Sequence, residues 1–357
     1  MSTNAARERF VPCNPVERPF SLAENTSMSV TSTPQGDETS TPDAGSRSLM
    51  KDLVKLARPV QWSKSAFVLV GPFYGWRDAV AIHEDAPHWR IILWAVAAAA
   101  SFALASSGCY VINDLADREA DRAHPRKMKR PIASGRVSPA RARAYAAAML
   151  AVSIAALFLI PAPARWWTLL AVVLYIANVM SYSVWLKHLV ISDVMSLSIG
   201  FVLRVMAGCA AVSIQPSTWL LNVVLFLSMF LAFGKRLGER RTLSETLDGA
   251  SGAALHRRVQ QQYTETILQM AVIVTAVATL MTYALYVQDS GEEYIRGFNL
   301  LWLSVLPASY GMLRCIVLLE AGRYDDPTEL ATHDRPFQLA GLAFLLVTVL
   351  APMAVSL

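Results

Sequence analysis

IILWAVAAAASFALASSGCYVINDLADREAD, residues 91–121, decides the fold of this chain. Residues 91–112 carry no charge, and the run is long enough to cross a bilayer, for which a helix needs about 20 mainly apolar residues. The run ends directly in Asn113, Asp114, Asp117 and Asp121. This order of residues predicts a membrane-spanning helix whose end carries a cluster of acids at the membrane boundary.

The rest of the chain repeats the apolar part of this pattern. Of its 357 residues 54% are hydrophobic and 17% charged, and the mean hydropathy is +0.37. This composition is typical of a polytopic membrane protein rather than of soluble domains. Helices are expected, because open sheets cannot span a bilayer and the apolar runs lack the alternation of a barrel. We therefore predict an all-α protein with nine transmembrane helices, at about 60–82, 91–112, 139–160, 164–186, 190–212, 217–234, 265–287, 299–320 and 336–356.

Residues 1–48 differ from the remainder in being rich in Ser, Thr, Pro and Glu. They contain no apolar run that could serve as a signal peptide. We predict a disordered cytoplasmic tail at 1–48 and one membrane domain at 49–357.

Two features of the composition exclude other classes of function. The four cysteines, Cys13, Cys109, Cys209 and Cys315, lie far apart without metal-ligand spacing, so we expect small buried side chains rather than ligands or disulfides. The net charge of +5 comes from basic residues gathered in particular loops, which indicates membrane topology and no nucleic-acid partner. The sequence predicts no particular oligomeric state.

The positions of the basic residues predict the orientation in the membrane. They gather in two connections, after the second apolar segment (residues 113–136) and after the sixth (residues 235–258), whereas the connection at 288–294 is acidic. Because basic loops stay in the cytoplasm, we expect the N-terminus and all the charged motifs on the cytoplasmic face of the inner membrane. Nine spans then place the C-terminus outside.

The acids after the second segment have helical spacing. Asn113, Asp117 and Asp121 recur at i, i+4 and i+8, and Asp114 joins the two later acids at i+3 and i+7, so a continuing helix would place them in one stripe. Carboxylate and amide oxygens suit Mg²⁺, which binds through one or two carboxylates together with substrate phosphates. The stripe is therefore a candidate site for a metal and a diphosphate. The alternative is a solvated helix end balanced by nearby arginines.

Basic residues follow within the stretch HPRKMKRPIASG, residues 124–135. Pro125 and Pro131 prevent a helix from continuing, so we expect Lys127, Lys129 and Arg130 on a loop that folds back over the acids. Such a mixture of acids and bases can bind phosphates through metal on one side and cationic side chains on the other.

Taken together, these motifs resemble the UbiA superfamily of intramembrane prenyltransferases. The resemblance rests on NDxxDxxxD at 113–121 and, more finely, on RPVQWSK (58–64), YSVWLK (182–187) followed by Asp193, GFVLR (200–204) and GKRLGE (234–239). The finer pattern is most similar to the subgroup of decaprenyl-phosphate phosphoribosyltransferases. The resemblance implies a helical bundle around a cytoplasm-facing cavity.

That subgroup implies a reaction and its partners. A 5-phosphoribosyl group would pass from phosphoribosyl pyrophosphate to a polyprenyl phosphate, with Mg²⁺ as cofactor, and the product would supply arabinose donors for cell-envelope arabinan. Asn113, Asp114, Asp117 and Asp121 would be catalytic, with Asn113, Asp117 and Asp121 holding the metal. The expected binding residues for phosphoribosyl pyrophosphate are Lys64, Lys127, Arg130, Tyr182, Lys187, Asp193, Arg204, Lys235 and Arg236. Arg204 lies deep in the fifth segment, so it should face the cavity or pair with an acid.

Two other functions remain open. Aromatic-acceptor prenyltransferases of the superfamily carry a second DxxxD motif, whereas here Asp193 is followed four residues later by Leu197. A transporter of anionic lipids or phosphates could use a basic cavity, but clustered acids would repel its cargo, and internal repeats are not evident.

Overall fold

The computed structural model describes residues 43–125, 127–245, 263–289, 294–295, 297–321 and 333–355. The chain is all-α, apart from a hairpin in which Tyr294–Ile295 (β1) pairs antiparallel with Phe298–Asn299 (β2). Residues 1–42 of the expected tail lie outside the described part. The α-helices are α1 (Asp43–Ala57), α2 (Val70–Tyr74), α3 (Trp76–Ile82), α4 (His88–Ala116), α5 (Arg118–Arg122), α6 (Pro139–Ala156), α7 (Ala162–Val184), α8 (Ser192–Ala211), α9 (Thr218–Glu245), α11 (Glu265–Asp289), α12 (Val305–Glu320) and α14 (Arg335–Val355). The 3₁₀ helices are η1 (Pro59–Leu69), η2 (Lys127–Lys129), η3 (Leu157–Leu159), η4 (Leu186–His188) and η5 (Leu300–Ser304).

Within this described part, 7 helical stretches are long and apolar enough to cross a bilayer, and Arg335–Ala351 is a shorter apolar helix. The protein is thus a polytopic membrane protein. The predicted count of nine transmembrane helices is not confirmed, and residues 60–82 form η1, α2 and α3 instead of one helix. Proline and glycine explain the difference: Pro59 and Pro72 lack amide donors, and Gly75 separates α2 from α3.

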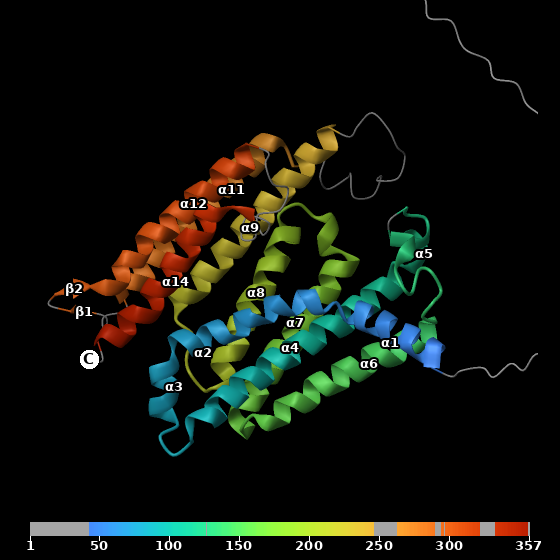
Figure 1. The fold of residues 1–357 in the computed structure, drawn as a ribbon, viewed down its shortest axis with the longest axis horizontal. Helices are drawn as coiled ribbons and strands as arrows, with labels where there is room; N and C mark the ends of the chain where they lie inside the picture. Colours follow the sequence, from blue (N-terminus) through green and yellow to red (C-terminus); the bar gives the residue numbers. More distant parts are fainter. Residues whose placement is uncertain are drawn as a thin grey trace, which may run out of the picture. The chain divides into compact units, whose positions relative to one another are not determined.

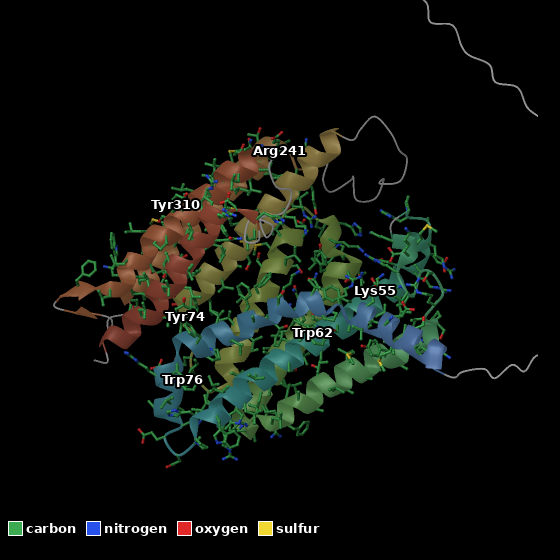
Figure 2. The ribbon with its side chains drawn as sticks, in the orientation of Figure 1. Lys55, Trp62, Tyr74, Trp76, Arg241 and Tyr310 are labelled. Carbon is green, nitrogen blue, oxygen red and sulfur yellow. The ribbon has the colours of Figure 1, made fainter. Side chains whose placement is uncertain are left out.

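This broken segment lies against later helices. A side chain at Gly208 of α8 would collide with the carbonyl oxygen of Val68, so only glycine lets η1 approach there. Figure 2 labels two side chains that hold the segment: Trp62 donates to Ser107 Oγ at 3.0 Å, and the Tyr74 ring meets Tyr286 of α11 edge to face at 5.7 Å.

The helices pack mainly with their neighbours in sequence. In Figure 1, α6 runs alongside α4, and α9, α11, α12 and α14 gather into one group. Because successive long helices run in opposite directions, the ends of α4, α7 and α9 lie at the same end of the bundle as the starts of α6, α8 and α11. That end carries the acidic and basic motifs.

Two element boundaries differ from prediction. Helix α1 begins at Asp43, inside the segment expected to be a tail. Helix α9 continues to Glu245, so Lys235, Arg236, Arg240 and Arg241 lie on a helix rather than in a loop. Pairing of Arg236 with Glu239 along the helix, at 2.8 Å, helps to extend it.

Candidate functional site

A polar cavity of about 280 Å³ opens among η1, α4, α7, α8 and the basic loop. Cys109, Tyr110, Tyr175, Val179, Leu197 and Phe201 form much of its less polar wall. Its charged and strongly polar lining residues are Arg58, Lys64, Asn113, Asp117, Lys127, Arg130, Asn178, Tyr182, Lys187 and Arg204. Cations outnumber acids in this lining, which suits a ligand that carries several negative charges.

Two residues of the motif NDxxDxxxD line the cavity, and the other two are buried in its wall. Helix α4 ends at Ala116, and Asp117 has a non-helical ψ of 3° before α5 begins at Arg118. Asn113 and Asp117 both line the cavity, and Asn113 Nδ2 donates to Asp117 Oδ2 at 3.1 Å. The single continuous stripe that the spacing predicted is therefore interrupted at Asp117.

Asp114 and Asp121 are buried behind this pair. Arg130 Nη1 bridges them, at 3.1 Å from Asp114 Oδ1 and 2.7 Å from Asp121 Oδ2. Arg58 Nη2 makes a second contact with Asp114 Oδ1 at 2.6 Å. The prediction that the basic loop folds back over the acids is confirmed by these pairs, although neither acid is among the cavity's lining residues.

The loop that carries Arg130 is held at several points. Ile132 and Val137 are fully buried, and Arg122 Nε donates to the carbonyl oxygen of Ala133 at 3.1 Å. Arg136 pairs with Asp52 of α1 at 3.0 Å, which joins the loop to the N-terminal helix. These buried side chains and polar contacts hold the loop, and with it Arg130, in place.

Three lysines line the cavity from different elements: Lys64 from η1, Lys127 from η2 and Lys187 from η4. Lys187 Nζ lies 3.9 Å from Asp117 Oδ1, which joins the α7–α8 connection to the acidic motif. Tyr182, near the end of α7, lines the cavity on the same side.

Asp193 does not line the cavity. Its carboxylate is buried, accepts from Tyr263 Oη at 2.8 Å through Oδ1 and pairs with Arg236 Nε at 3.2 Å through Oδ2. Arg236 Nη2 reaches Tyr182 Oη at 3.5 Å, so these residues support Tyr182 from behind. Lys235 and Arg236 are likewise absent from the described lining, and Lys235 is exposed.

Arg204 lies in the cavity wall, deep in α8, with only 4% of its surface exposed. Nη1 donates to the carbonyl oxygen of Gly200 at 2.8 Å and Nη2 to Tyr175 Oη at 2.9 Å. The guanidinium lies over the rings of Tyr175 and Phe201, at 4.6 and 5.2 Å from their centroids. Within the described residues, no carboxylate lies within ion-pair distance of it. Arg204 was expected either to face the cavity or to pair with an acid, and in the structure it faces the cavity.

Proteins of similar sequence identify the family to which this chain belongs. Residues 69–304 match the model of the UbiA prenyltransferase family. The chain belongs to the UbiA prenyltransferase family. It is 33% identical over 305 residues to a decaprenyl-phosphate phosphoribosyltransferase of Corynebacterium glutamicum, covering 85% of this chain and 88% of the relative. A protein of the same description from Mycolicibacterium smegmatis is 33% identical over 319 residues, covering 86% and 95%.

A solved UbiA homologue from Archaeoglobus fulgidus, bound to DMAPP and Mg²⁺, shares the fold with a TM-score of 0.60 at 18% identity. The match covers 85% of this chain and 99% of that one. The resemblance drawn from the motifs is thus confirmed, and this chain is a membrane-embedded transferase of the UbiA family.

Sequence reasoning missed several lining residues in this UbiA chain, among them Arg58 and Tyr175. Arg58 stands first in the RPVQWSK motif, and a buried Asp114 needs cationic partners, so this pairing could have been anticipated. Tyr175 lies mid-helix in α7 and gave no signal, because an aromatic residue there is indistinguishable from core.

The oxygens of this UbiA cavity fit Mg²⁺ only in part. The Asn113 amide and the Asp117 carboxylate face the cavity, whereas Asp121 is committed to Arg130. Among the described residues, no group of three or more His, Cys, Asp or Glu side chains could hold a metal ion. An ion at Asn113 and Asp117 would therefore depend on ligand phosphates for the rest of its shell, which is the ordinary mode for Mg²⁺.

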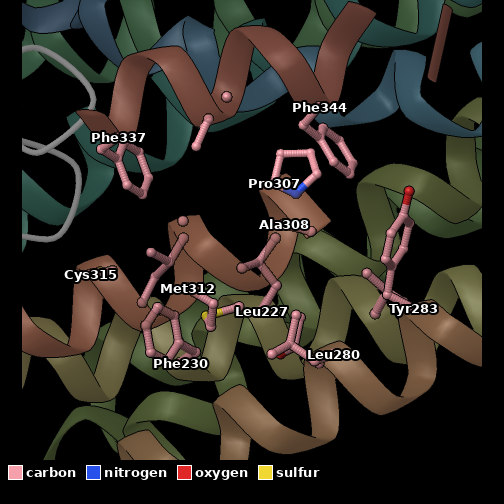
Figure 3. A pocket seen from close by; sticks show the side chains of 16 residues that line it. Leu227, Phe230, Leu280, Tyr283, Pro307, Ala308, Met312, Cys315, Phe337 and Phe344 are labelled. Atoms are coloured by element: carbon pink, nitrogen blue, oxygen red, sulfur yellow. The ribbon is translucent and has the colours of Figure 1, made fainter. Parts of the chain in front are cut away.

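A second pocket, of about 270 Å³, lies among α9, α11, α12 and α14. Figure 3 shows Phe337 and Phe344 of α14 on one side, with Phe230 and Leu280 across the gap. It shares no lining residue with the polar cavity, and its apolar walls suit a hydrocarbon chain.

Proposed function

We propose that this UbiA-family enzyme transfers 5-phosphoribosyl from phosphoribosyl pyrophosphate to a polyprenyl phosphate, decaprenyl phosphate in particular, and releases diphosphate. The observation that carries the proposal is Asp117, the single acid among the described lining residues, which is hydrogen-bonded to Asn113 and surrounded by cations while Asp193 is turned away. A donor with a phosphate besides its diphosphate matches an excess of cationic side chains. The names of the relatives support the same substrates.

In this reaction a phosphate oxygen of the lipid attacks ribose C1 as the bond from C1 to the diphosphate oxygen breaks. The electron pair of that bond leaves with the diphosphate. The acceptor is already an anion, so no side chain has to remove a proton. The protein contributes alignment of the two substrates and neutralisation of the charge on the departing group.

The position of each charged residue in the cavity indicates its role in this reaction. Lys187 and Asp117 lie side by side, which favours contact between Lys187 and the diphosphate. Lys64, Lys127 and Arg130 add positive charge from two other elements. When bound by Asn113 and Asp117, Mg²⁺ would supply further neutralisation of the diphosphate. Asp114 and Asp121 act through Arg130, whose guanidinium they hold in place.

We further propose that the cavity faces the cytoplasm from the inner membrane. Basic residues of the cavity end lie on α5, η2, η4 and α9, as the positive-inside rule expects for cytoplasmic segments. The soluble, highly charged donor is then reached from the cytoplasm, while the lipid acceptor enters from the bilayer. The product would feed synthesis of arabinose donors for cell-envelope arabinan.

A transfer assay on the purified protein tests this function. The protein in detergent is mixed with Mg²⁺, decaprenyl phosphate and labelled phosphoribosyl pyrophosphate, and a parallel reaction contains a prenyl diphosphate with 4-hydroxybenzoate. We expect label to enter the lipid phase only in the first reaction and only with Mg²⁺. Prenylation of the aromatic acid without phosphoribosyl transfer would contradict the proposal, and absence of both products would favour transport.

A further inference from the structure

Arg204 is a positive charge buried at membrane depth without a carboxylate partner in the described structure. Placing an unpaired cation there is costly, and such residues are retained where they meet a ligand or a counter-ion. Arg204 Nε is buried and has no hydrogen-bond partner. A guanidinium carries five N–H donors, and the two bonds from Nη1 and Nη2 leave others unused.

The position of Arg204 separates it from Asn113 and Asp117. Its partner Tyr175 donates to Ser106 Oγ at 3.1 Å, and Ser106 precedes Asn113 by about two turns of α4, or about 10 Å along the axis. The guanidinium therefore lies at a deeper level of the cavity than Asn113 and Asp117. A diphosphate held at Asn113 and Asp117 would not occupy both levels.

Gly200 leaves open the space beside the guanidinium. A Cβ added there would lie 3.5 Å from Arg204 Nη1, 3.6 Å from Tyr175 Cε2 and 3.8 Å from Asn178 Nδ2, all ordinary contacts. The cavity lining includes Gly200, Tyr175 and Asn178. A ligand can thus approach the guanidinium across the bare backbone of Gly200.

We infer that Arg204, Tyr175 and Gly200 form a second anion subsite that binds a phosphate monoester, distinct from the diphosphate site at Asn113 and Asp117. A monoester dianion offers several acceptor oxygens to the unused donors of the guanidinium. The inference rests on the proposed function, whose substrates contain two such groups: the 5-phosphate of the donor and the phosphate of the lipid acceptor.

Binding is measured without turnover, so that the test does not depend on transfer. Thermal unfolding of the purified full chain in detergent is followed with ribose 5-phosphate, with farnesyl phosphate, and with ribose as the control that lacks a phosphate. The variants are Arg204→Gln and Gly200→Ala, the second of which keeps the guanidinium. Arg143→Gln on α6 is the matched control, because it makes the same change at an exposed arginine that lines neither pocket.

We expect one monoester to stabilise the wild-type protein and Arg143→Gln, with affinity reduced at least about tenfold in Arg204→Gln and in Gly200→Ala. Stabilisation by ribose 5-phosphate alone assigns the subsite to the donor, and stabilisation by farnesyl phosphate alone assigns it to the acceptor. The inference is overturned if neither monoester stabilises the wild-type protein, or if both subsite variants bind as the wild type does.

The transfer assay separates the two proposals. If monoester binding depends on Arg204 but the protein transfers no phosphoribosyl group, the subsite is supported and the proposed function is contradicted. If the wild-type protein transfers phosphoribosyl but the subsite variants bind the monoester with unchanged affinity, the function is supported and the subsite is contradicted.

Discussion

Asp117 lies at the break between α4 and α5, with one carboxylate oxygen accepting from Asn113 and the other 3.9 Å from Lys187 Nζ. Asp121, four residues later, is buried against Arg130. Helical spacing alone treats these two acids as equivalent. The geometry distinguishes a carboxylate that a ligand can reach from one that supports a neighbouring cation.

Asp117→Asn should lower kcat by on the order of 10² to 10³-fold, because it removes charge at the point where leaving-group charge is neutralised. Its thermal unfolding should stay close to that of the wild type, since Asp117 is only partly buried. Steady-state kinetics in detergent and thermal unfolding measure the two effects. Glu119→Gln is the control, because Glu119 is an exposed acid of the same motif. Near-normal turnover in folded Asp117→Asn would contradict its assignment.

Asp121→Asn should act mainly on stability. It weakens a charged hydrogen bond in the wall of the site, so we expect the free energy of unfolding to fall by about 1–3 kcal/mol. Thermal unfolding against wild type and Glu119→Gln measures this loss. An unchanged unfolding temperature together with lost turnover would show instead that Asp121 meets the ligand.

At the scale of elements, the start of α8 depends on a residue far along the chain. Ile191, which precedes the helix, has a φ of +68°, a value rarely adopted by a β-branched residue. Its amide donates to Tyr263 Oη at 2.6 Å, and the same hydroxyl donates to Asp193. Burial raises the pKa of Tyr263, so the phenol keeps its proton for that bond.

Tyr263→Phe should raise KM for phosphoribosyl pyrophosphate more than it lowers kcat. The ring packing is retained, but Asp193 and Arg236 lose the bond that fixes them behind Tyr182. Separate titrations of donor and lipid in the transfer assay measure the split. Tyr283→Phe is the matched control, since it removes a buried hydroxyl bonded to Ser304 at 2.6 Å and borders only the apolar pocket. Equal behaviour of the two variants would contradict a positioning role.

The elements also show where sequence reasoning succeeds. Eight of the nine predicted segments contain one long α-helix, because long apolar runs satisfy their backbone groups in lipid in this way. The first segment is helical but broken into η1, α2 and α3, which hydropathy does not register because the breaks come from Pro59, Pro72 and Gly75. At the site, Asn113, Asp117 and three of the lysines named from the motifs line one cavity, whereas the burial of Asp193 depends on Tyr263, a contact across 70 positions.

At the scale of the whole molecule, the alternation of long helices places the cavity at one end and the β1–β2 hairpin at the other. Exposed Glu119 on α5 and Phe298 on β2 mark these ends. A protein oriented as proposed exposes the first to the cytoplasm and the second to the opposite side.

Cysteine labelling checks this orientation. In a Cys13→Ser background, where Cys109, Cys209 and Cys315 are buried, we expect an impermeant maleimide to label Phe298→Cys in intact spheroplasts. Glu119→Cys should be labelled only after the membrane is opened. Labelling of Glu119→Cys in intact spheroplasts would reverse the topology and place the cavity outside.

The close fit of η1 against Gly208 has a consequence for biogenesis. The surfaces that accommodate this broken segment belong to α4 and α8, so the ribosome releases residues 59–69 well before their packing partners exist. The stretch must wait at the translocon or the membrane surface until α8 has been inserted. A segment synthesised before α4 and α8 thus reaches its final conformation only after both of them are in place.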